Sequence, residues 1–188
     1  MLRSITLGLG LALAFSHAVT AADAQPTFEP KAYLMNYSEA DLLKRVPPAR
    51  PEDVSSPEAI VRAMHDAVSG PKGHWDDKRL RSLFVPDALI EFTDEGADGV
   101  PRIQSISLDE LVRIFSELHA QTSWYERAVA LNVVVMQRKG EKATLAVVNH
   151  MGDEGVSPAK GPEGHGPATS MTQVVKLQGR WWITSHTW

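Results

Sequence analysis

The second half of the chain contains long runs rich in β-branched residues, separated by turn residues, and this pattern limits the fold more than any other feature. A glycine-containing dipeptide between two such runs favours a tight hairpin turn. The sequence therefore predicts one hairpin about Lys139-Gly140 and a second about Gln178-Gly179. The predicted strands are Ser123–Gln137, Lys142–Met151, Ala168–Leu177 and Arg180–Trp188. Strands joined by short turns run antiparallel, so the C-terminal half is expected to form an antiparallel sheet.

Helices are predicted in the first half of the chain. Ser56 can cap a helix and Pro57 stands at its first position, where a missing N–H costs nothing. A second helix is expected over Asp77–Phe84, and Pro86-Asp87 is expected to turn the chain into a strand, Ala88–Phe92. Another helix begins after Ser107, which has capping-box spacing to an acidic residue. Helices first and strands last predict an α+β fold with the helices on one face of the sheet.

Residues 1–24 are predicted to form a cleavable signal peptide. An apolar run, Ile5–Phe15, follows Arg3, and Ala22-Asp23-Ala24 fits the small-residue pattern read by signal peptidase. A cut after Ala21 is the alternative. The run is shorter than the ~20 apolar residues that span a bilayer, so no stable membrane insertion is expected after cleavage. The mature protein is therefore expected to be periplasmic or secreted.

Residues 25–55 are predicted to form a proline-rich N-terminal arm. Proline continues neither a helix nor a sheet ladder, so most of this stretch is expected to be extended. One short helix is expected where Ser38 and Asp41 have capping-box spacing ahead of Leu42. The folded domain is then expected to cover residues 56–188.

Composition excludes several classes of chemistry. The chain contains no cysteine, so thiol catalysis and thiolate metal sites are ruled out. No two histidines have the short spacing of a metal site, and no phosphate- or dinucleotide-binding motif is present. The net charge is −4 and no basic patch stands out, which argues against a nucleic-acid partner. No metal and no cofactor are expected.

Three features carry a family resemblance. They are a first helix, then Asp76–Phe84 ahead of Pro86-Asp87-Ala88, and a closing Gly179-Arg180-Trp181-Trp182-Ile183. Together they resemble the nuclear transport factor 2-like superfamily, which includes SnoaL-like and ketosteroid-isomerase-like domains, over Ser56–Trp188. The resemblance implies a cone-shaped roll, a curved antiparallel sheet wrapped around N-terminal helices, often forming a homodimer and holding a ligand at its open end. Because the superfamily contains enzymes and proteins without catalysis, the fold alone selects no function.

Strand alternation selects four candidate ligand-facing residues. In the first hairpin, the predicted pairing puts His150 on a largely apolar face that it shares with Tyr125. In the second hairpin, it puts His186 opposite Met171, on a face that it shares with Gln173. A histidine among apolar neighbours is suited to acid–base work or to a satisfied structural role. The sequence predicts that Tyr125, His150, Gln173 and His186 line the ligand site.

Acidic side chains add one catalytic candidate. Glu91 and Glu126 lie inside predicted strands, where such residues face solvent more often than they act as bases. His65 lies on the flank of the first predicted helix and is expected to be a hydrogen-bonded boundary residue. If the domain is an enzyme, the candidate bases are Glu91, His150 and His186.

Three functions stay open at this point. The favoured one is an exported domain that binds a small apolar or amphipathic molecule. The second is a cofactor-free isomerase, dehydratase or hydrolase that works by acid–base chemistry. The third is a non-catalytic interaction or assembly module. An open pocket with converging histidine and glutamate side chains favours the enzyme, an open apolar pocket without them favours binding, and a sealed interior favours the module.

Overall fold

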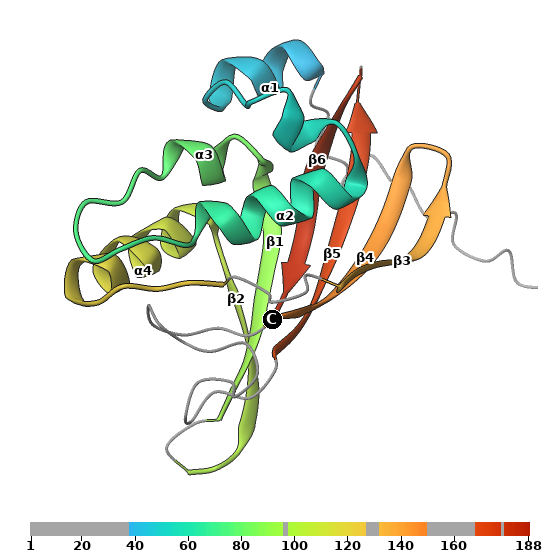
Figure 1. The fold of residues 1–188 in the computed structure, drawn as a ribbon. Helices are drawn as coiled ribbons and strands as arrows, with labels where there is room; N and C mark the ends of the chain where they lie inside the picture. Colours follow the sequence, from blue (N-terminus) through green and yellow to red (C-terminus); the bar gives the residue numbers. More distant parts are fainter. Residues whose placement is uncertain (1–37, 96–97, 127–131, 150–167, 178) are drawn as a thin grey trace, which may run out of the picture. The chain divides into compact units, whose positions relative to one another are not determined.

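A six-stranded sheet forms the framework of the protein, as a computed structural model shows (Figure 1). The structure describes residues 38–95, 98–126, 132–149, 168–177 and 179–188, which all fall in one compact unit of the chain. The strand order is β2-β1-β6-β5-β4-β3. Their bounds are β1 Phe84–Glu95, β2 Pro101–Ile106, β3 Asn132–Lys139, β4 Lys142–Asn149, β5 Ala168–Leu177 and β6 Arg180–Thr187. Every neighbouring pair is antiparallel except β1 and β6, which run parallel.

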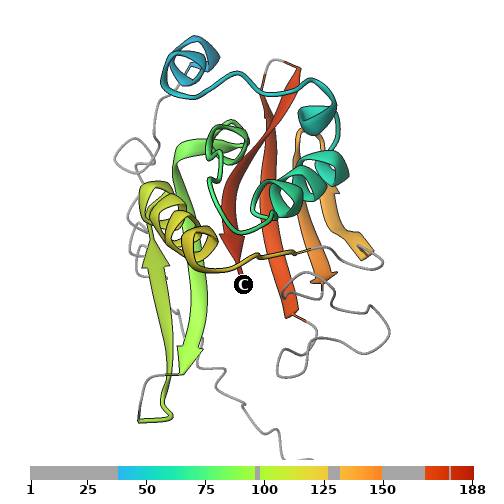
Figure 2. The same ribbon diagram turned by 60° about the vertical axis from the view of Figure 1, so that its left-hand side comes forward.

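The helices gather on one face of this sheet (Figures 1 and 2). They are α1 Glu39–Arg45, the 3-10 helix η2 Glu52–Val54, α2 Pro57–Ala67, α3 Lys78–Arg81 and α4 Leu108–Gln121. Helix α2 packs against β3, β4 and β6, and α4 packs against β1. The predicted α+β class is therefore confirmed, and the arrangement is consistent with the roll that the family resemblance implies. The one change is that the sheet is mixed.

Side-chain capping fixes where three helices begin. The hydroxyls of Ser38, Ser56 and Ser107 each accept a hydrogen bond from the backbone amide three residues later. That bond satisfies one of the amides that a helix N-terminus leaves without an internal partner. All three starts agree with the sequence prediction, because capping depends only on residues that are adjacent in the chain.

The core lies between the helices and the face of the sheet that they cover, which we call the inner face. On β5 the inner-face residues are Ser170, Thr172 and Val174, each at most 2% exposed. The apolar faces of α2 and α4 supply the opposite wall. Residues of this core that are buried and apolar include Ile60, Met64, Leu80, Phe84, Leu111, Phe115, Leu145 and Ile183.

The middle of the chain departs from the predicted bounds. The predicted helix 77–84 is shortened to α3, because Phe84 joins β1 and pairs with Ile183 of β6. The predicted turn at Pro86-Asp87 lies within β1, where the β1–β6 register shifts. Long-range strand pairing thus overrides the local helical pattern.

No helix among the described residues is long and apolar enough to cross a membrane.

Part of the predicted arm packs on the domain. Leu42 of α1 is 1% exposed. Asp53 of η2 is also buried, and both of its carboxylate oxygens accept hydrogen bonds from the guanidinium of Arg79, at 2.8 Å each. Residues 38–55 therefore contribute to the same compact unit as the residues that follow. Residues 1–37, which hold the predicted signal peptide and the rest of the arm, lie outside the described residues.

The two predicted hairpin registers fail in different places: the β5–β6 register is correct near its turn and wrong beyond a β-bulge, whereas the β3–β4 register is already wrong at its turn. In β5–β6, Gln173 pairs with Ser185 whereas Val174 pairs with Ile183, so Thr184 is an extra residue on β6. In β3–β4, the turn lies one residue later than predicted and Met136 is the extra residue. A one-residue shift moves every side chain beyond it to the other face of the sheet.

Candidate functional site

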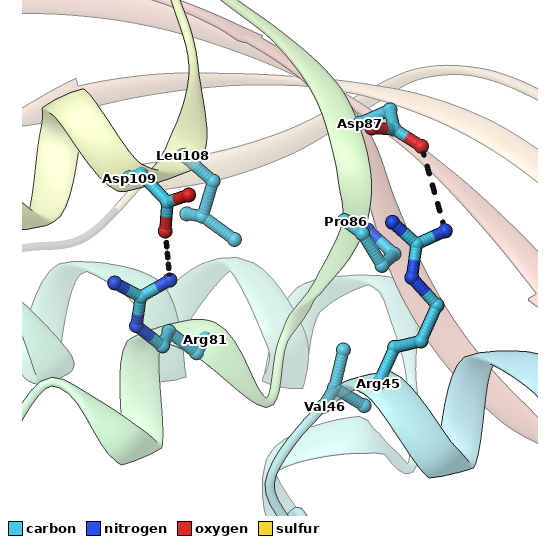
Figure 3. Close-up of a pocket in the computed structure, with 7 residues that line it drawn as sticks. All are labelled: Arg45, Val46, Arg81, Pro86, Asp87, Leu108 and Asp109. Atoms are coloured by element: carbon cyan, nitrogen blue, oxygen red, sulfur yellow. Dashed lines mark hydrogen bonds and ion pairs between the residues drawn. The ribbon is translucent and has the colours of Figure 1, made fainter.

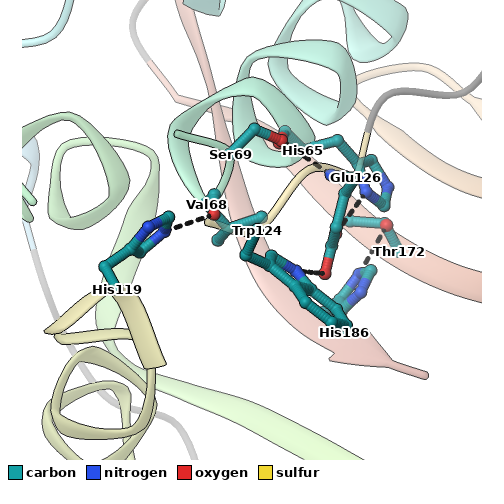
Figure 4. A network of polar contacts seen from close by, with 8 residues as sticks. All are labelled: His65, Val68, Ser69, His119, Trp124, Glu126, Thr172 and His186. Atoms are coloured by element: carbon teal, nitrogen blue, oxygen red, sulfur yellow. Dashed lines mark hydrogen bonds and ion pairs between the residues drawn. The ribbon is translucent and has the colours of Figure 1, made fainter. Parts of the chain in front are cut away.

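Four buried polar side chains from four parts of the chain meet at the inner face (Figure 4). They are His65 of α2, Glu126 just ahead of β3, Thr172 of β5 and His186 of β6, and none is more than 2% exposed. Polar groups in a core need partners, because each unpaired one costs free energy. This buried cluster, which we call the histidine cluster, is the most concentrated chemistry among the described residues.

His65 and Glu126 form a buried pair. The Nδ1 atom of His65 lies 2.8 Å from Oε2 of Glu126. The Ser69 hydroxyl connects the same two residues, because it accepts from the backbone N–H of Glu126 at 2.8 Å and donates to the backbone carbonyl of His65 at 2.7 Å. The indole Nε1 of Trp124 donates to the other carboxylate oxygen, Oε1, at 3.4 Å. The carboxylate is therefore held from both of its oxygens.

His186 stands beside this pair, and the bulge at Thr184 brings it there. It pairs with Thr172 across the β5–β6 ladder, and the Thr172 hydroxyl lies 2.8 Å from Nδ1 of His186. The rings of His186 and His65 meet edge to face, with centroids 6.0 Å apart. The ring of Trp188 also packs edge to face on His186, with centroids 4.1 Å apart.

Burial keeps the imidazole of His186 uncharged. Loss of hydration lowers the pKa of His186 well below its ordinary value, and the positive charge of neighbouring His65 lowers it further. A neutral imidazole carries one hydrogen, so one ring nitrogen donates and the other accepts. Near neutral pH, His186 is therefore suited to hydrogen bonding with a neutral group. With so low a pKa it is a weak general base, because an efficient base has a pKa near the working pH.

Three buried polar atoms on this part of the inner face have no hydrogen-bond partner among the described residues. They are Nε2 of His186, the hydroxyl oxygen of Ser170 and the indole Nε1 of Trp188. Ser170 lies two residues before Thr172 on β5, so both side chains point to the inner face. Such atoms occur in native proteins where water, a ligand or catalysis requires them.

A third buried histidine has a structural role. His119, near the end of α4, has Nε2 3.0 Å from the carbonyl oxygen of Val68 and Nδ1 3.2 Å from that of Pro71. Its ring also stacks on Trp75 at 5.7 Å. These contacts fasten the segment after α2 to α4, and they lie apart from the histidine cluster.

Of the four residues predicted to face a ligand, the structure places only His186 in the cluster. Gln173 is exposed, because it points away from Thr172 on the opposite face of β5. The predicted shared face of Gln173 and His186 is therefore wrong, and the bulge at Thr184 is the cause. Tyr125 is partly buried beside Glu126, ahead of β3. His150 lies outside the described residues.

Glu91 does not join the histidine cluster either. Its neighbour Ile90 pairs with His186 on the inner face, so the side chain of Glu91 points to the other face, where it accepts a hydrogen bond from the Ser105 hydroxyl at 3.2 Å. Sequence reasoning missed His65 and Glu126 as partners. They are 61 residues apart, and no local pattern links residues at that separation.

A second feature is a small hollow between α1, β1 and α4 (Figure 3). Its volume is about 240 Å³, and it is lined by Arg45, Val46, Arg81, Pro86, Asp87, Leu108 and Asp109. The side chain of Arg45 pairs with Asp87, and that of Arg81 pairs with Asp109. Because the positive charge of each arginine is balanced by an acidic side chain in the hollow itself, the hollow is poorly suited to bind a charged ligand.

In the part of the chain that the structure describes, no group of three or more histidine or acidic side chains is placed so that it could hold a metal ion. The histidine cluster contributes two imidazoles and one carboxylate, but His65 and Glu126 already bind each other. The arrangement is therefore a hydrogen-bonding site in an otherwise apolar interior.

No family model and no curated protein matches the chain. Solved NTF2-like and cystatin-like structures match it over most of its length. An NTF2-like protein of unknown function from Silicibacter pomeroyi is 18% identical, with 69% of this chain and 87% of the other covered and a TM-score of 0.44. An NTF2-like protein of unknown function from Shewanella baltica is 12% identical, with 68% of this chain and 85% of the other covered and a TM-score of 0.43. A protein of unknown function with a cystatin-like fold from Nostoc punctiforme is 15% identical, with 68% of this chain and 83% of the other covered and a TM-score of 0.46. These similarities concern the fold and identify neither a ligand nor a reaction.

Proposed function

We propose that this domain binds a small molecule in its interior, against the inner face of β5 and β6 beside His186. One observation carries the proposal: the buried Nε2 of His186, the hydroxyl of Ser170 and Nε1 of Trp188 have no partner among the described residues. Leaving a buried polar group unpaired costs about 1–3 kcal/mol. Three such atoms close together are most economically explained by a bound molecule that pairs with them.

Acid–base catalysis is the second candidate, and the buried pair of His65 and Glu126 favours it. An imidazole and a carboxylate 2.8 Å apart can hold a proton and pass it on. His186, with its lowered pKa, would then bind the substrate while the pair exchanges the proton. Binding remains the first proposal, because it needs only the unpaired atoms, whereas catalysis also needs a reacting group within reach of the pair.

Native mass spectrometry of the protein purified from its host tests the binding proposal. A retained mass should accompany the wild-type protein and be lost from His186→Phe, which fills the site with an apolar ring. Gln173→Ala is the matched control, because Gln173 lies on the opposite face of the same strand. Loss of the retained mass from both variants, or from neither, would contradict binding at this place. A wild-type protein that carries no added mass under gentle ionisation would count against the proposal as a whole.

Self-association is a separate proposal, supported by apolar side chains on the outer face of the sheet. Val134, Ala146 and Met171 are aligned across β3, β4 and β5, and Val134 and Met171 are about half exposed. Contiguous exposed apolar side chains often mark interaction sites. If two copies pair through this face, Met171→Lys should halve the mass measured by light scattering, whereas Leu43→Lys on α1 should not. A monomeric wild-type protein would refute it.

Export is the last part of the proposal, and it rests on the sequence of residues 1–24. Intact-mass measurement of the protein made in its host should give a chain that begins at Gln25, or at Ala22 if the earlier cut is used. A chain that retains Met1 would refute cleavage.

A further inference from the structure

We infer that the bound molecule is uncharged and presents a hydrogen-bond-accepting oxygen to the indole N–H of Trp188, beside His186 and Ser170. This inference rests on the proposed binding function and adds the chemical class of the ligand. It follows from where the three unpaired atoms lie, what each can donate or accept, and which charges surround them.

The three side chains lie next to one another on the sheet. Met171 pairs with Thr187 and Thr172 pairs with His186 across the β5–β6 ladder, so Ser170 of β5 lies beside the end of β6, next to Trp188. The Trp188 ring is held in place by two neighbours, because it packs on His186 at 4.1 Å and on Phe92 at 5.7 Å between centroids. The backbone N–H of Trp188 also donates to the carbonyl of Glu91 at 3.1 Å. These contacts therefore fix the position of the Trp188 indole beside β5 and β6.

The chemistry of the three atoms requires an acceptor on the ligand. An indole nitrogen only donates, so no group other than an acceptor satisfies Nε1 of Trp188. Nε2 of His186 donates when the Thr172 hydroxyl donates to Nδ1, and accepts in the other tautomer. The Ser170 hydroxyl can do either. A ligand with one oxygen that accepts, such as a ketone, can therefore satisfy the indole and still find a second donor beside it.

The charges nearby favour an uncharged ligand. Nδ1 of His65 is already engaged by the carboxylate of Glu126 at 2.8 Å, and burial lowers the pKa of His186, so that its ring is neutral. An anion placed here would meet no uncommitted cation among these side chains. A cation would meet a donor-only indole. Either would lose its hydration without a compensating partner.

The body of the ligand is expected to be apolar and flat. Aromatic rings border the polar atoms, namely those of Phe92, Trp124 and Trp188. Such rings prefer to stack on other rings or on flat apolar groups. An aryl ketone therefore combines the two features that the site selects, a flat apolar body and one accepting oxygen.

Three probes of the same size separate these requirements: acetophenone, which is neutral and accepts; ethylbenzene, which is neutral and cannot accept; and benzoate, which accepts but is charged. Binding is followed in the full-length protein through the nitrogen-15 indole resonances of its tryptophans. The resonance of Trp188 is assigned by its loss in Trp188→Phe. The resonance of Trp75 is the internal reference, because its indole already donates to the carbonyl of Ala67 at 2.8 Å.

Acetophenone should move the Trp188 indole resonance and leave that of Trp75 in place. Ethylbenzene and benzoate should each bind at least about tenfold more weakly than acetophenone. Ethylbenzene leaves the buried donors unpaired, and benzoate brings an uncompensated charge. Equal binding of ethylbenzene or benzoate would overturn the inference about ligand class and leave the binding function intact. Failure of all three probes to move Trp188 at millimolar concentration would count against the site and the proposed function together.

Discussion

Acidification tests the environment of His186 directly. Burial and the charge of His65 lower the pKa of His186 well below the value of 6.5 that the free side chain has. In the unfolded chain His186 takes up a proton as the pH falls through about 6.5, whereas in the folded protein it does not until a much lower pH. The unfolded state therefore binds more protons in this window. The stability that neutral His186 contributes is fully present above its pKa in the unfolded chain, and it is lost progressively as the pH falls below that value.

The size of the effect follows from proton linkage. Each proton that only the unfolded state binds changes the free energy of unfolding by about 1.4 kcal/mol per pH unit. Between about pH 6.5 and about pH 5, His186 alone should therefore remove up to about 2 kcal/mol. This loss is a substantial part of the roughly 5–15 kcal/mol that stabilises an ordinary domain.

Urea unfolding of the wild-type protein and of His186→Asn over this pH range provides the measurement. The substitution removes the titrating group and keeps a polar side chain opposite Thr172, so the slope of stability against pH should be shallower by about one proton. His65 and Glu126 are present in both proteins, so the difference between the two pH profiles reports the change at position 186. His74→Asn is the control, because His74 is exposed. Parallel pH profiles of wild type and His186→Asn would show that the reasoning about burial is wrong.

Two further predictions concern buried charges. Glu126→Ala should lower the free energy of unfolding by about 3 kcal/mol, because it leaves His65 buried without its carboxylate partner. Chemical denaturation provides the measurement. The control Glu117→Ala, which removes an exposed ion pair, should lower the free energy of unfolding by less than about 1 kcal/mol. Asp53→Asn should cost about 2 kcal/mol by weakening a two-fold charged hydrogen bond, and limited proteolysis should then cut residues 38–55 sooner. Asp66→Asn should change neither property, because Asp66 is exposed and 3.9 Å from the same arginine.

The parts of the fold that depend on neighbouring residues could be predicted from the sequence. Helix starts at Ser38, Ser56 and Ser107 follow from capping, which involves only the next three residues. The bounds of β5 follow from the turn residues that stand on either side of it, the Gly/Pro-rich stretch before Ala168 and Gln178-Gly179 after Leu177. The start of β1 could not be predicted, because Phe84 continues a helical pattern locally and is drawn into the sheet by Ile183, far away in the chain.

The histidine cluster was beyond sequence reasoning for the same physical reason. Glu126 reads as a solvent-facing residue of a strand, yet it is 2% exposed because His65 and Trp124 supply its partners. The bridge between Gly70 and Trp124 holds that segment against the end of α2. A carboxylate is buried only where partners compensate its lost hydration, and those partners come from parts of the chain that meet only after folding.

The face on which His186 lies is decided by a single residue. Without the extra residue at Thr184, the β5–β6 ladder would keep the register that begins at Leu177 and Arg180, and His186 would be paired with Met171 as the sequence alone suggests. It would then share the outer face of β5 with Met171, away from His65. The bulge is stabilised where β6 lies between β1 and β5, with the Thr184 hydroxyl donating to the carbonyl of Gln173 at 3.2 Å. The candidate site is therefore a consequence of strand register, and Thr184, a residue outside the histidine cluster, controls whether it exists.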